Sequence, residues 1–125
     1  MSVSISNTAR SFPRLPYQQM KDDILGPEYR LSLVFVGRTR AQALNRTYRH
    51  KSYVPNVLSF PLAPDSGEVF ITPTVAKEQA HRYHLSHTGY VGYLFIHALL
   101  HLKGLDHGDA MERAEREYLQ QYGLS

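Results

Sequence analysis

The chain has 125 residues, a length that suits one hydrophobic core, and we expect residues 1–125 to form a single domain. Hydrophobic residues make up 42% of it, but no apolar run reaches the roughly 18 residues that span a bilayer, and the lack of cysteine excludes disulfides and thiolate metal ligands. The net charge is only +3, yet the charges are unevenly distributed along the chain.

The N-terminal part predicts a strand followed by a helix. Its first segment is polar and has no apolar signal region, so we expect a cytoplasmic protein without a membrane association. Val3 and Ile5 alternate with serines, which predicts a short first strand. Residues 16–25 are expected to be helical and to stop at Gly26 and Pro27.

A second strand and a second helix are expected next. Residues 29–36 are rich in β-branched and aromatic side chains, as is typical of a strand. Thr39 and Gln42 have the spacing of a capping box, which predicts that a helix opens at Thr39. The expected apolar face of this helix comprises Ala41, Leu44 and Tyr48.

The same region is basic and contains no acidic residue between Glu28 and Asp65. Its cations are Arg30, Arg38, Arg40, Arg46, Arg49 and Lys51. Such a segment can attract a polyanion such as RNA. It can equally be a solvated cationic face that acids elsewhere balance, and charge alone does not decide between these two interpretations.

Two further strands are predicted in the middle of the chain. Residues 56–60 form a short strand that Pro61 is expected to close. A turn at residues 65–67 then leads into a strand over residues 68–71.

The C-terminal half is predicted to be helical. Thr72 is a candidate N-cap, with Pro73 at the first helical position, for a helix that ends near Leu85. The helix over residues 88–103, which Gly104 ends, is apolar nearly all round and should be the buried central helix. Asp109 and Glu112 have the spacing of a second capping box, which predicts a last helix with Met111, Tyr118 and Leu119 facing inward. Because strands cluster early and helices late, we expect an α+β fold with a small mixed sheet of about four strands and about five helices.

Three histidines have metal-ligand spacing at the end of the central helix. His97 and His101 differ by four positions, so they project from one helical face and can reach one ion at about 2.0–2.1 Å. Gly104 is expected to end the helix with a positive φ, after which the chain can return His107 to the same ion. Three histidine ligands leave a position for water, which is typical of a catalytic metal site.

The alternative is that these histidines are hydrogen-bonded core residues. Each would then need a buried partner, at a cost of about 1–3 kcal/mol if the partner were missing. A third histidine just after a helix-ending glycine is hard to attribute to chance. The positions also match the H-E-x-x-H-x-x-G-x-x-H pattern of the metzincin proteases, which predicts a zincin-like metal helix. Ala98 stands where that pattern needs its catalytic glutamate, which disfavours a peptidase.

Several longer sequence blocks, spread over nearly the whole chain, carry a second and more extensive resemblance. Residues 95–107 read Phe-Ile-His-Ala-Leu-Leu-His-Leu-Lys-Gly-Leu-Asp-His, and further runs lie at residues 44–51, 56–61, 67–73 and 111–115. In this order of blocks the chain resembles the YbeY family, with its H-G-x-L-H-L-x-G-x-D-H, L-N-x-x-Y-R-x-K-D, T-D/N-V-L-S-F-P, G-D-I-x-I-x-P and M-E-x-x-E segments. The family consists of bacterial single-strand-type endoribonucleases implicated in rRNA maturation and ribosome quality control.

The sequence departs from the family pattern at a few positions. Ala98 replaces the usual glycine, Ser52 an aspartate, Pro55 a threonine and Glu68 an aspartate. The connections at residues 65–67 and after His107 look short, so we expect a trimmed member. None of these departures touches a predicted metal ligand.

The resemblance implies a metal-dependent endoribonuclease that hydrolyses RNA phosphodiesters with a metal-bound water. Arg49 matches the functional arginine of the family, and a guanidinium can grip a phosphate bidentately. The alternative role for Arg49 is that of a surface cation or of a cation at the C-terminus of the helix. Arg46 and Lys51 are weaker candidates for RNA contacts, which solvation explains equally well.

One zinc ion is the expected cofactor, although three imidazoles also suit nickel, cobalt, iron or copper. The implied partners are RNA, in particular rRNA, and the ribosome or ribosome-assembly proteins. An alternative is a ribosome-associated RNA-binding module whose metal is mainly structural; a metallopeptidase is the third hypothesis.

Other polar residues are expected to have supporting roles or ordinary surface positions. Asp106 is expected to orient a histidine or to cap a turn, and Asn45 to bind backbone near the site. Ser59 has no partner in the sequence that would make it a nucleophile. Surface roles are expected for a second histidine group, which comprises His81, His84 and His87.

Overall fold

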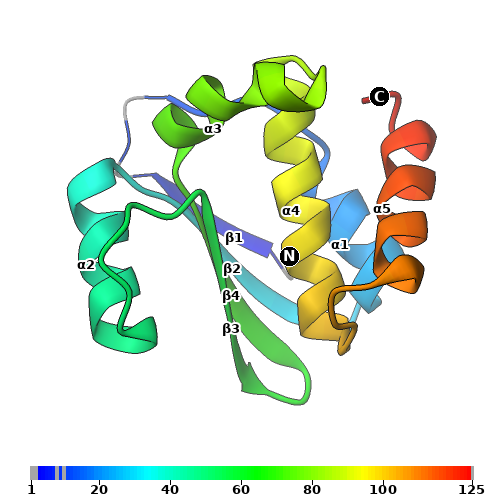
Figure 1. The fold of residues 1–125 in the computed structure, drawn as a ribbon. Coiled ribbons are helices and arrows are strands. Elements are labelled where there is room, and N and C mark those ends of the chain that lie inside the picture. Colours follow the sequence, from blue (N-terminus) through cyan, green and yellow to red (C-terminus); the bar gives the residue numbers. More distant parts are fainter. Residues whose placement is uncertain (1–2, 8, 10, 125) are drawn as a thin grey trace.

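The computed structural model describes residues 3–7, 9 and 11–124 (Figure 1). The elements are β1 (Val3–Asn7), α1 (Tyr17–Leu25), β2 (Arg30–Phe35), α2 (Arg38–Arg49), β3 (Val57–Ala63), β4 (Ser66–Ile71), α3 (Pro73–Gln79), the 3-10 helix η1 (Ala80–Tyr83), α4 (His87–Lys103) and α5 (Asp109–Gln121). Within this described part of the chain, no helix has both the length and the apolar character needed to cross a membrane.

The strands of the described chain form one mixed sheet in the order β1-β2-β4-β3. β1, β2 and β4 are parallel, with Val3 opposite Leu31 and Leu33 opposite Val69. β3 is antiparallel to β4 and lies at an edge of the sheet. Four strands and five α-helices among the described residues confirm the predicted α+β class.

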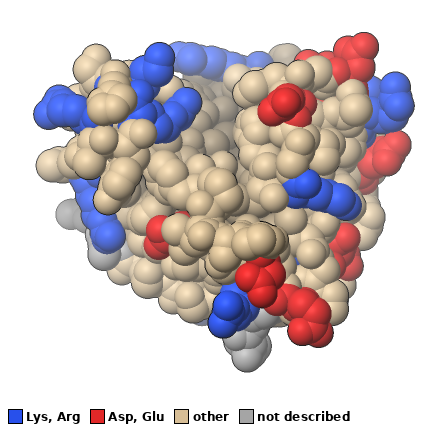
Figure 2. Space-filling view, turned by 90° about the horizontal axis from the view of Figure 1, so that it is seen from below, with Lys and Arg blue, Asp and Glu red and all other residues tan. Residues whose placement is uncertain are grey.

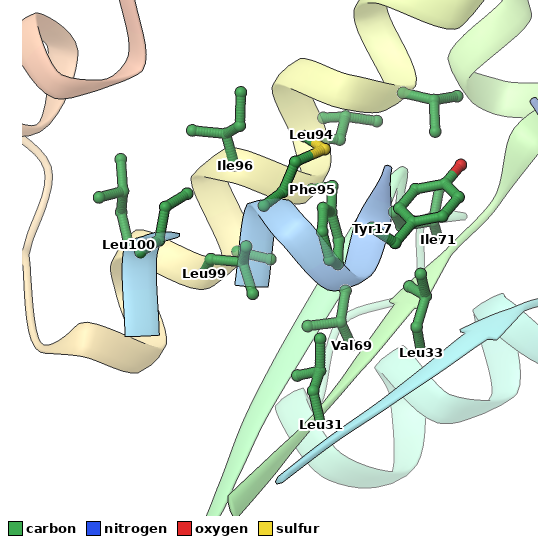
Figure 3. Packing of buried hydrophobic residues seen from close by; sticks show 14 of the residues in the cluster. Tyr17, Leu31, Leu33, Val69, Ile71, Leu94, Phe95, Ile96, Leu99 and Leu100 are labelled. Atoms are coloured by element: carbon green, nitrogen blue, oxygen red, sulfur yellow. The ribbon is translucent and has the colours of Figure 1, made fainter. Parts of the chain in front are cut away.

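The two faces of the sheet carry separate hydrophobic clusters. Alternate residues of a strand point to opposite faces, so Leu31, Leu33 and Phe35 belong to one cluster, and Val34 and Val36 to the other. The larger cluster lies between the sheet and helices α1 and α4 (Figure 3), whereas α2 covers the opposite face (Figure 1). Each large side chain buried there stabilises the fold by about 1.5–3 kcal/mol, so the larger cluster contributes most of the stability.

Helix α4 is the central helix, as predicted, and the sheet, α1, α3 and α5 all pack against it. Phe95, Ile96 and Leu99 are completely buried in this packing. The helix begins one residue earlier than predicted, because the Ser86 hydroxyl accepts a hydrogen bond of 3.0 Å from the N–H of Gly89 and caps it. The helix is therefore capped at its N-terminus and packed against the sheet and three helices along its length.

The helix predicted to run from Thr72 to about Leu85 is shorter than expected. Helix α3 ends at Gln79 and continues as the 3-10 helix η1. His84 then adopts the left-handed conformation with a φ of 57°, and the N–H of Leu85 donates to the Ala80 carbonyl at 3.3 Å. This closing turn stops the helix before the predicted end, a termination that helical periodicity does not reveal.

Strand β3 is longer than predicted, because Pro61 does not close it. Pro61 lies opposite Gly67, and the strand continues to Ala63 with an irregularity in the pairing between Pro61 and Ala63. Proline has no N–H to donate, but β3 is an edge strand, where one side of the strand needs no donor. The turn consequently lies at Pro64 and Asp65, just before the predicted position.

The two predicted capping boxes do not form. Helices α2 and α5 follow Gly37 and Gly108, and neither has a side-chain cap hydrogen bond. Met111 and Leu119 are buried as predicted, but Tyr48 is 65% exposed and its ring contacts Phe60 at 5.6 Å. The apolar face of α2 is therefore narrower than its sequence indicated.

Candidate metal centre

Three imidazoles converge at the C-terminal end of α4; we call His97, His101 and His107 the histidine cluster. One ring nitrogen of each lies within 4.8 Å of the others, and the Nε2 atoms of His97 and His101 are 3.1 Å apart. The ring centroids are separated by 4.6 to 5.2 Å. This donor set could hold a metal ion, and all three donors are nitrogens, which suits zinc and similar divalent ions.

The backbone after α4 brings the third histidine back to the helix. Gly104 has a φ of 109°, as its predicted role requires, and its N–H donates to the His101 carbonyl at 3.0 Å. The N–H of Leu105 donates to the Leu100 carbonyl at 3.0 Å, which completes a Schellman motif. The chain therefore reverses sharply, and His107 faces the two histidines of the helix.

The outer ring nitrogens of the helical histidines are anchored. Nδ1 of His97 lies 2.5 Å from the Oε2 of Glu115, a carboxylate on α5 that is only 5% exposed. Nδ1 of His101 lies 3.1 Å from the Leu105 carbonyl. A donor hydrogen on each Nδ1 leaves the lone pair of Nε2 free to face the centre of the cluster, as in metal sites of the carboxylate–histidine type.

Electrostatics favour the neutral form of the middle ligand. Burial lowers the pKa of His101 below its usual range, and the neighbouring His97 and His107 lower it further. The Leu105 carbonyl and Asp106 act in the opposite direction but do not reverse the shift. A neutral imidazole is the form that binds a metal ion.

Replacing Glu115 by glutamine is expected to weaken zinc binding about 10- to 100-fold. Glutamine keeps the size of the side chain and a carbonyl acceptor, but it removes the negative charge that raises the basicity of the His97 ring. Zinc titration with a competing chelator measures this loss. Glu112→Gln is the matched control, since Glu112 is exposed on the same helix. Equal zinc affinities of the two variants would contradict the anchoring role.

A cleft of about 410 Å³ opens beside the histidine cluster, between α4 and the edge strand β3. Its lining residues are Arg49, Tyr53, Pro55, Asn56, Val57, Leu58, Ser59, Pro61, His97, Ala98, His101, Leu102 and His107. Arg49, the last residue of α2, thus shares the cleft with the three histidines. Of the described residues that line the cleft, Arg49 contributes positive charge and none is an acid.

The other predicted RNA contacts lie outside this cleft. Arg46 and Lys51 are exposed near the end of α2, and neither lines the cleft. In Figure 2, Lys and Arg side chains gather mainly on the left, the side of α2, and Asp and Glu mainly on the right. The basic segment therefore forms a surface next to the site, and only its end reaches the histidines.

The remaining polar residues take different positions. The amide of Asn45 is buried and donates to the Tyr53 carbonyl at 3.0 Å, which holds the segment between α2 and β3 as predicted. Asp106 is exposed, and the Leu105 carbonyl occupies the place at His101 that we expected for it. His81 and His84 are exposed, as expected, whereas Nε2 of His87 lies 2.9 Å from the Pro73 carbonyl.

Sequence reasoning missed two residues of the site. Glu115 was recognised only as part of a family block and received no role, although a carboxylate one helical turn after the buried Met111 is an unusual acid on an apolar face. Tyr53 lies in a loop and lines the cleft, and it is 54% exposed. No periodicity marks a loop residue, so the sequence carried no signal for it.

Known proteins share this sequence and this fold. The family model described as Endoribonuclease YbeY matches residues 3–124. A protein named Endoribonuclease YbeY from Alkaliphilus metalliredigens is 42% identical over 100 residues, which cover 71% of this chain and 64% of the relative. One of the same name from Staphylococcus carnosus is 34% identical over 122 residues, which cover 84% of this chain and 80% of the relative.

The chain spans 60 to 64% of the length of the Alkaliphilus and Bdellovibrio relatives that it matches. The solution structure of a Thermotoga maritima protein has a similar fold, with a TM-score of 0.69 and 20% identity over 96% of this chain and 88% of that one. The family model and the identities of 34 to 42% agree with the motifs read from the sequence, and this chain belongs to the YbeY family.

Proposed function

We propose that this chain is a metal-dependent endoribonuclease that hydrolyses phosphodiesters of single-stranded RNA. The observation that carries the proposal is the position of Arg49 in the same cleft as the three converging imidazoles. A cationic group beside the reacting phosphate stabilises the negative charge that develops on it. Arg49 supplies such a group in the described lining of the cleft, and that lining contains no carboxylate to repel the phosphate.

In this proposal His97, His101 and His107 hold one divalent ion, with zinc the first choice. When bound, the ion would supply Lewis-acid activation of water and of a phosphoryl oxygen. Glu115 and the Leu105 carbonyl keep the His97 and His101 rings in their binding orientation. Arg49 binds the phosphate through two N–H groups and stabilises the negative charge that builds up on it.

The peptidase hypothesis lacks a residue for its central step. Ala98 follows the first histidine, is 1% exposed and has no group that accepts a proton. A zincin peptidase uses a glutamate at this position to activate water. The missing glutamate therefore argues against a peptidase, and Arg49 in the cleft favours a substrate with negative charge, such as RNA.

We infer further that the natural substrate is rRNA in the cytoplasm, with the ribosome or its assembly proteins as partners. The resemblance of the chain to the YbeY family supports this inference, as does the basic surface of α2 next to the cleft. The single-strand preference is what the resemblance to the family implies, and a matched duplex tests it directly.

Chelation is expected to slow cleavage of a labelled single-stranded RNA by at least about 100-fold, and added zinc should restore it. The zinc-loaded chain, the chelated chain and the chain reloaded with zinc are incubated with this RNA, its duplex, the matching DNA strand and a peptide mixture. Gel analysis and mass spectrometry measure the products. Equal RNA loss with and without chelator would overturn metal dependence, and cleavage of peptides alone would overturn the RNA substrate.

A further inference from the structure

A group of stacked tyrosines lies next to the histidine cluster, outside the lining of the cleft; we call Tyr83, Tyr90 and Tyr93 the tyrosine cluster. The ring of Tyr83 stacks on Tyr90 with centroids 4.9 Å apart and on Tyr93 at 5.9 Å, with interplanar angles of 21° and 27°. Tyr90 and Tyr93 are themselves 5.8 Å apart and nearly parallel, at 15°. The three rings therefore form a layered aromatic surface on α4 and η1.

The tyrosine cluster combines a buried ring, Tyr90, with an exposed ring, Tyr83. Tyr90 is 1% exposed. Its hydroxyl accepts a hydrogen bond from the side-chain amide of Asn56 at 3.3 Å and donates one to the side-chain Oε1 of Gln79 at 3.1 Å. Tyr83, in contrast, is 52% exposed at the end of η1. Packing explains the buried tyrosine, but it does not explain why a large aromatic ring remains half in water on top of it.

The tyrosine cluster adjoins the histidine cluster. The ring of Tyr93 is 6.0 Å from the ring of His97, one helical turn away. Asn56, which contacts Tyr90, also lines the cleft. Tyr83 is thus two ring-to-ring steps from His97, a span that one or two nucleotides of an extended strand can bridge.

The chemistry of the open ring suits a nucleobase. Single strands are held mainly by bases that stack on exposed aromatic rings and by cations that contact the phosphates. Arg82 precedes Tyr83 in the chain and is exposed, so it is available to supply such a cation. A purely aliphatic ligand would gain nothing from the arginine, so a strand with flat bases and charged phosphates fits the pair best.

We propose that Tyr83 stacks on a nucleobase of the RNA strand, one or two nucleotides from the phosphate that lies at the histidine cluster. This inference rests on the proposed function, because it takes RNA as the substrate. The buried Tyr90 and half-buried Tyr93 stack on Tyr83 and support its ring. Tyr83 is then a substrate-binding residue with no part in the chemistry.

The test combines Tyr83 variants with an RNA that lacks one base at a time. The chelated full-length chain is titrated with labelled single-stranded RNAs, each with an abasic ribose at one position, and fluorescence anisotropy gives the affinity. For the wild type we expect one or two positions at which the missing base weakens binding about tenfold or more. Tyr83→Leu, which keeps an apolar cover over Tyr90, should bind the intact RNA about tenfold more weakly and lose this position dependence. Tyr83→Phe should behave like the wild type.

Tyr48→Leu is the matched control, because Tyr48 is also exposed but contacts Phe60, whose ring packs with the cluster under α2. It should leave the abasic profile unchanged, and thermal unfolding checks that every variant is folded. A profile that is flat in the wild type, or identical in Tyr83→Leu, would overturn the subsite. A separate cleavage assay distinguishes the two proposals. If the chain cleaves RNA but no abasic position weakens its binding, the nuclease function stands and the subsite fails. If the chain does not cleave RNA but its binding depends on one base through Tyr83, the subsite stands and the nuclease function fails.

Discussion

The His101→Ala chain is expected to lose zinc affinity and RNA cleavage by at least about 1000-fold while it remains folded. His101 is the middle donor: its Nε2 lies 3.1 Å from that of His97, and its ring centroid is 4.8 Å from that of His107. His97 and His107 alone cannot provide the three nitrogen donors of the proposed metal site. The fold should survive because His101 lies on the cleft side of α4, whereas the completely buried Phe95 and Leu99 hold the helix to the sheet.

This variant also separates a catalytic metal from a structural one. Zinc titration, the RNA assay and thermal unfolding with and without chelator are measured on the same preparation. His81→Ala is the control for zinc binding, since His81 is exposed on η1, away from the histidine cluster. If His101→Ala were unfolded, or if chelation unfolded the wild type, the metal would be structural and the RNA-binding module would become the better description.

The second large effect is expected at Arg49. Arg49→Ala should lower kcat/KM for RNA cleavage about 100- to 1000-fold while zinc affinity stays unchanged. The reason is that Arg49 lies in the cleft, where it can contact a phosphate, but is no member of the histidine cluster. Its exposure at the end of α2 makes a change in stability of more than about 0.5 kcal/mol unexpected.

Two further variants define what Arg49 does. Arg49→Lys keeps the charge but loses the planar fork, so it should recover only a small part of the activity. Arg46→Ala, on the same helix but outside the cleft, should change cleavage only a few-fold through weaker general attraction of RNA. An Arg49→Ala chain that cleaves RNA like the wild type at equal zinc content would remove this residue from the mechanism.

Local signals predicted the parts of the site that depend on neighbouring residues. The spacing of His97 and His101 is a property of any α-helix, and the glycine that ends the helix has the expected positive φ. The β-branched and aromatic residues over 29–36 likewise predicted a strand, and the structure forms β2 there. These predictions were confirmed because each needs only a few consecutive residues.

The failures occurred where a distant contact decides the outcome. Pro61 does not end β3, because the strand lies at the sheet edge, and only the strand order places it there. Glu115 contacts His97 because α5 packs on α4, an arrangement that no spacing along either helix encodes. Tyr83 was read as part of a regular helix, whereas the left-handed turn at His84 ends η1 and leaves its ring half exposed on the tyrosine cluster.

By itself, then, the sequence predicted the three histidines that the structure brings together, the helix that carries two of them and the family to which the chain belongs. The tertiary structure alone decided which other groups meet them. Helix α2 packs on the face of the sheet opposite α4, and its last residue, Arg49, lines the cleft together with residues of α4 and of the edge strand β3. Ligand spacing follows from backbone geometry over one helical turn, but the meeting of Arg49, Glu115 and the histidines follows from the burial of apolar faces on two sides of one sheet.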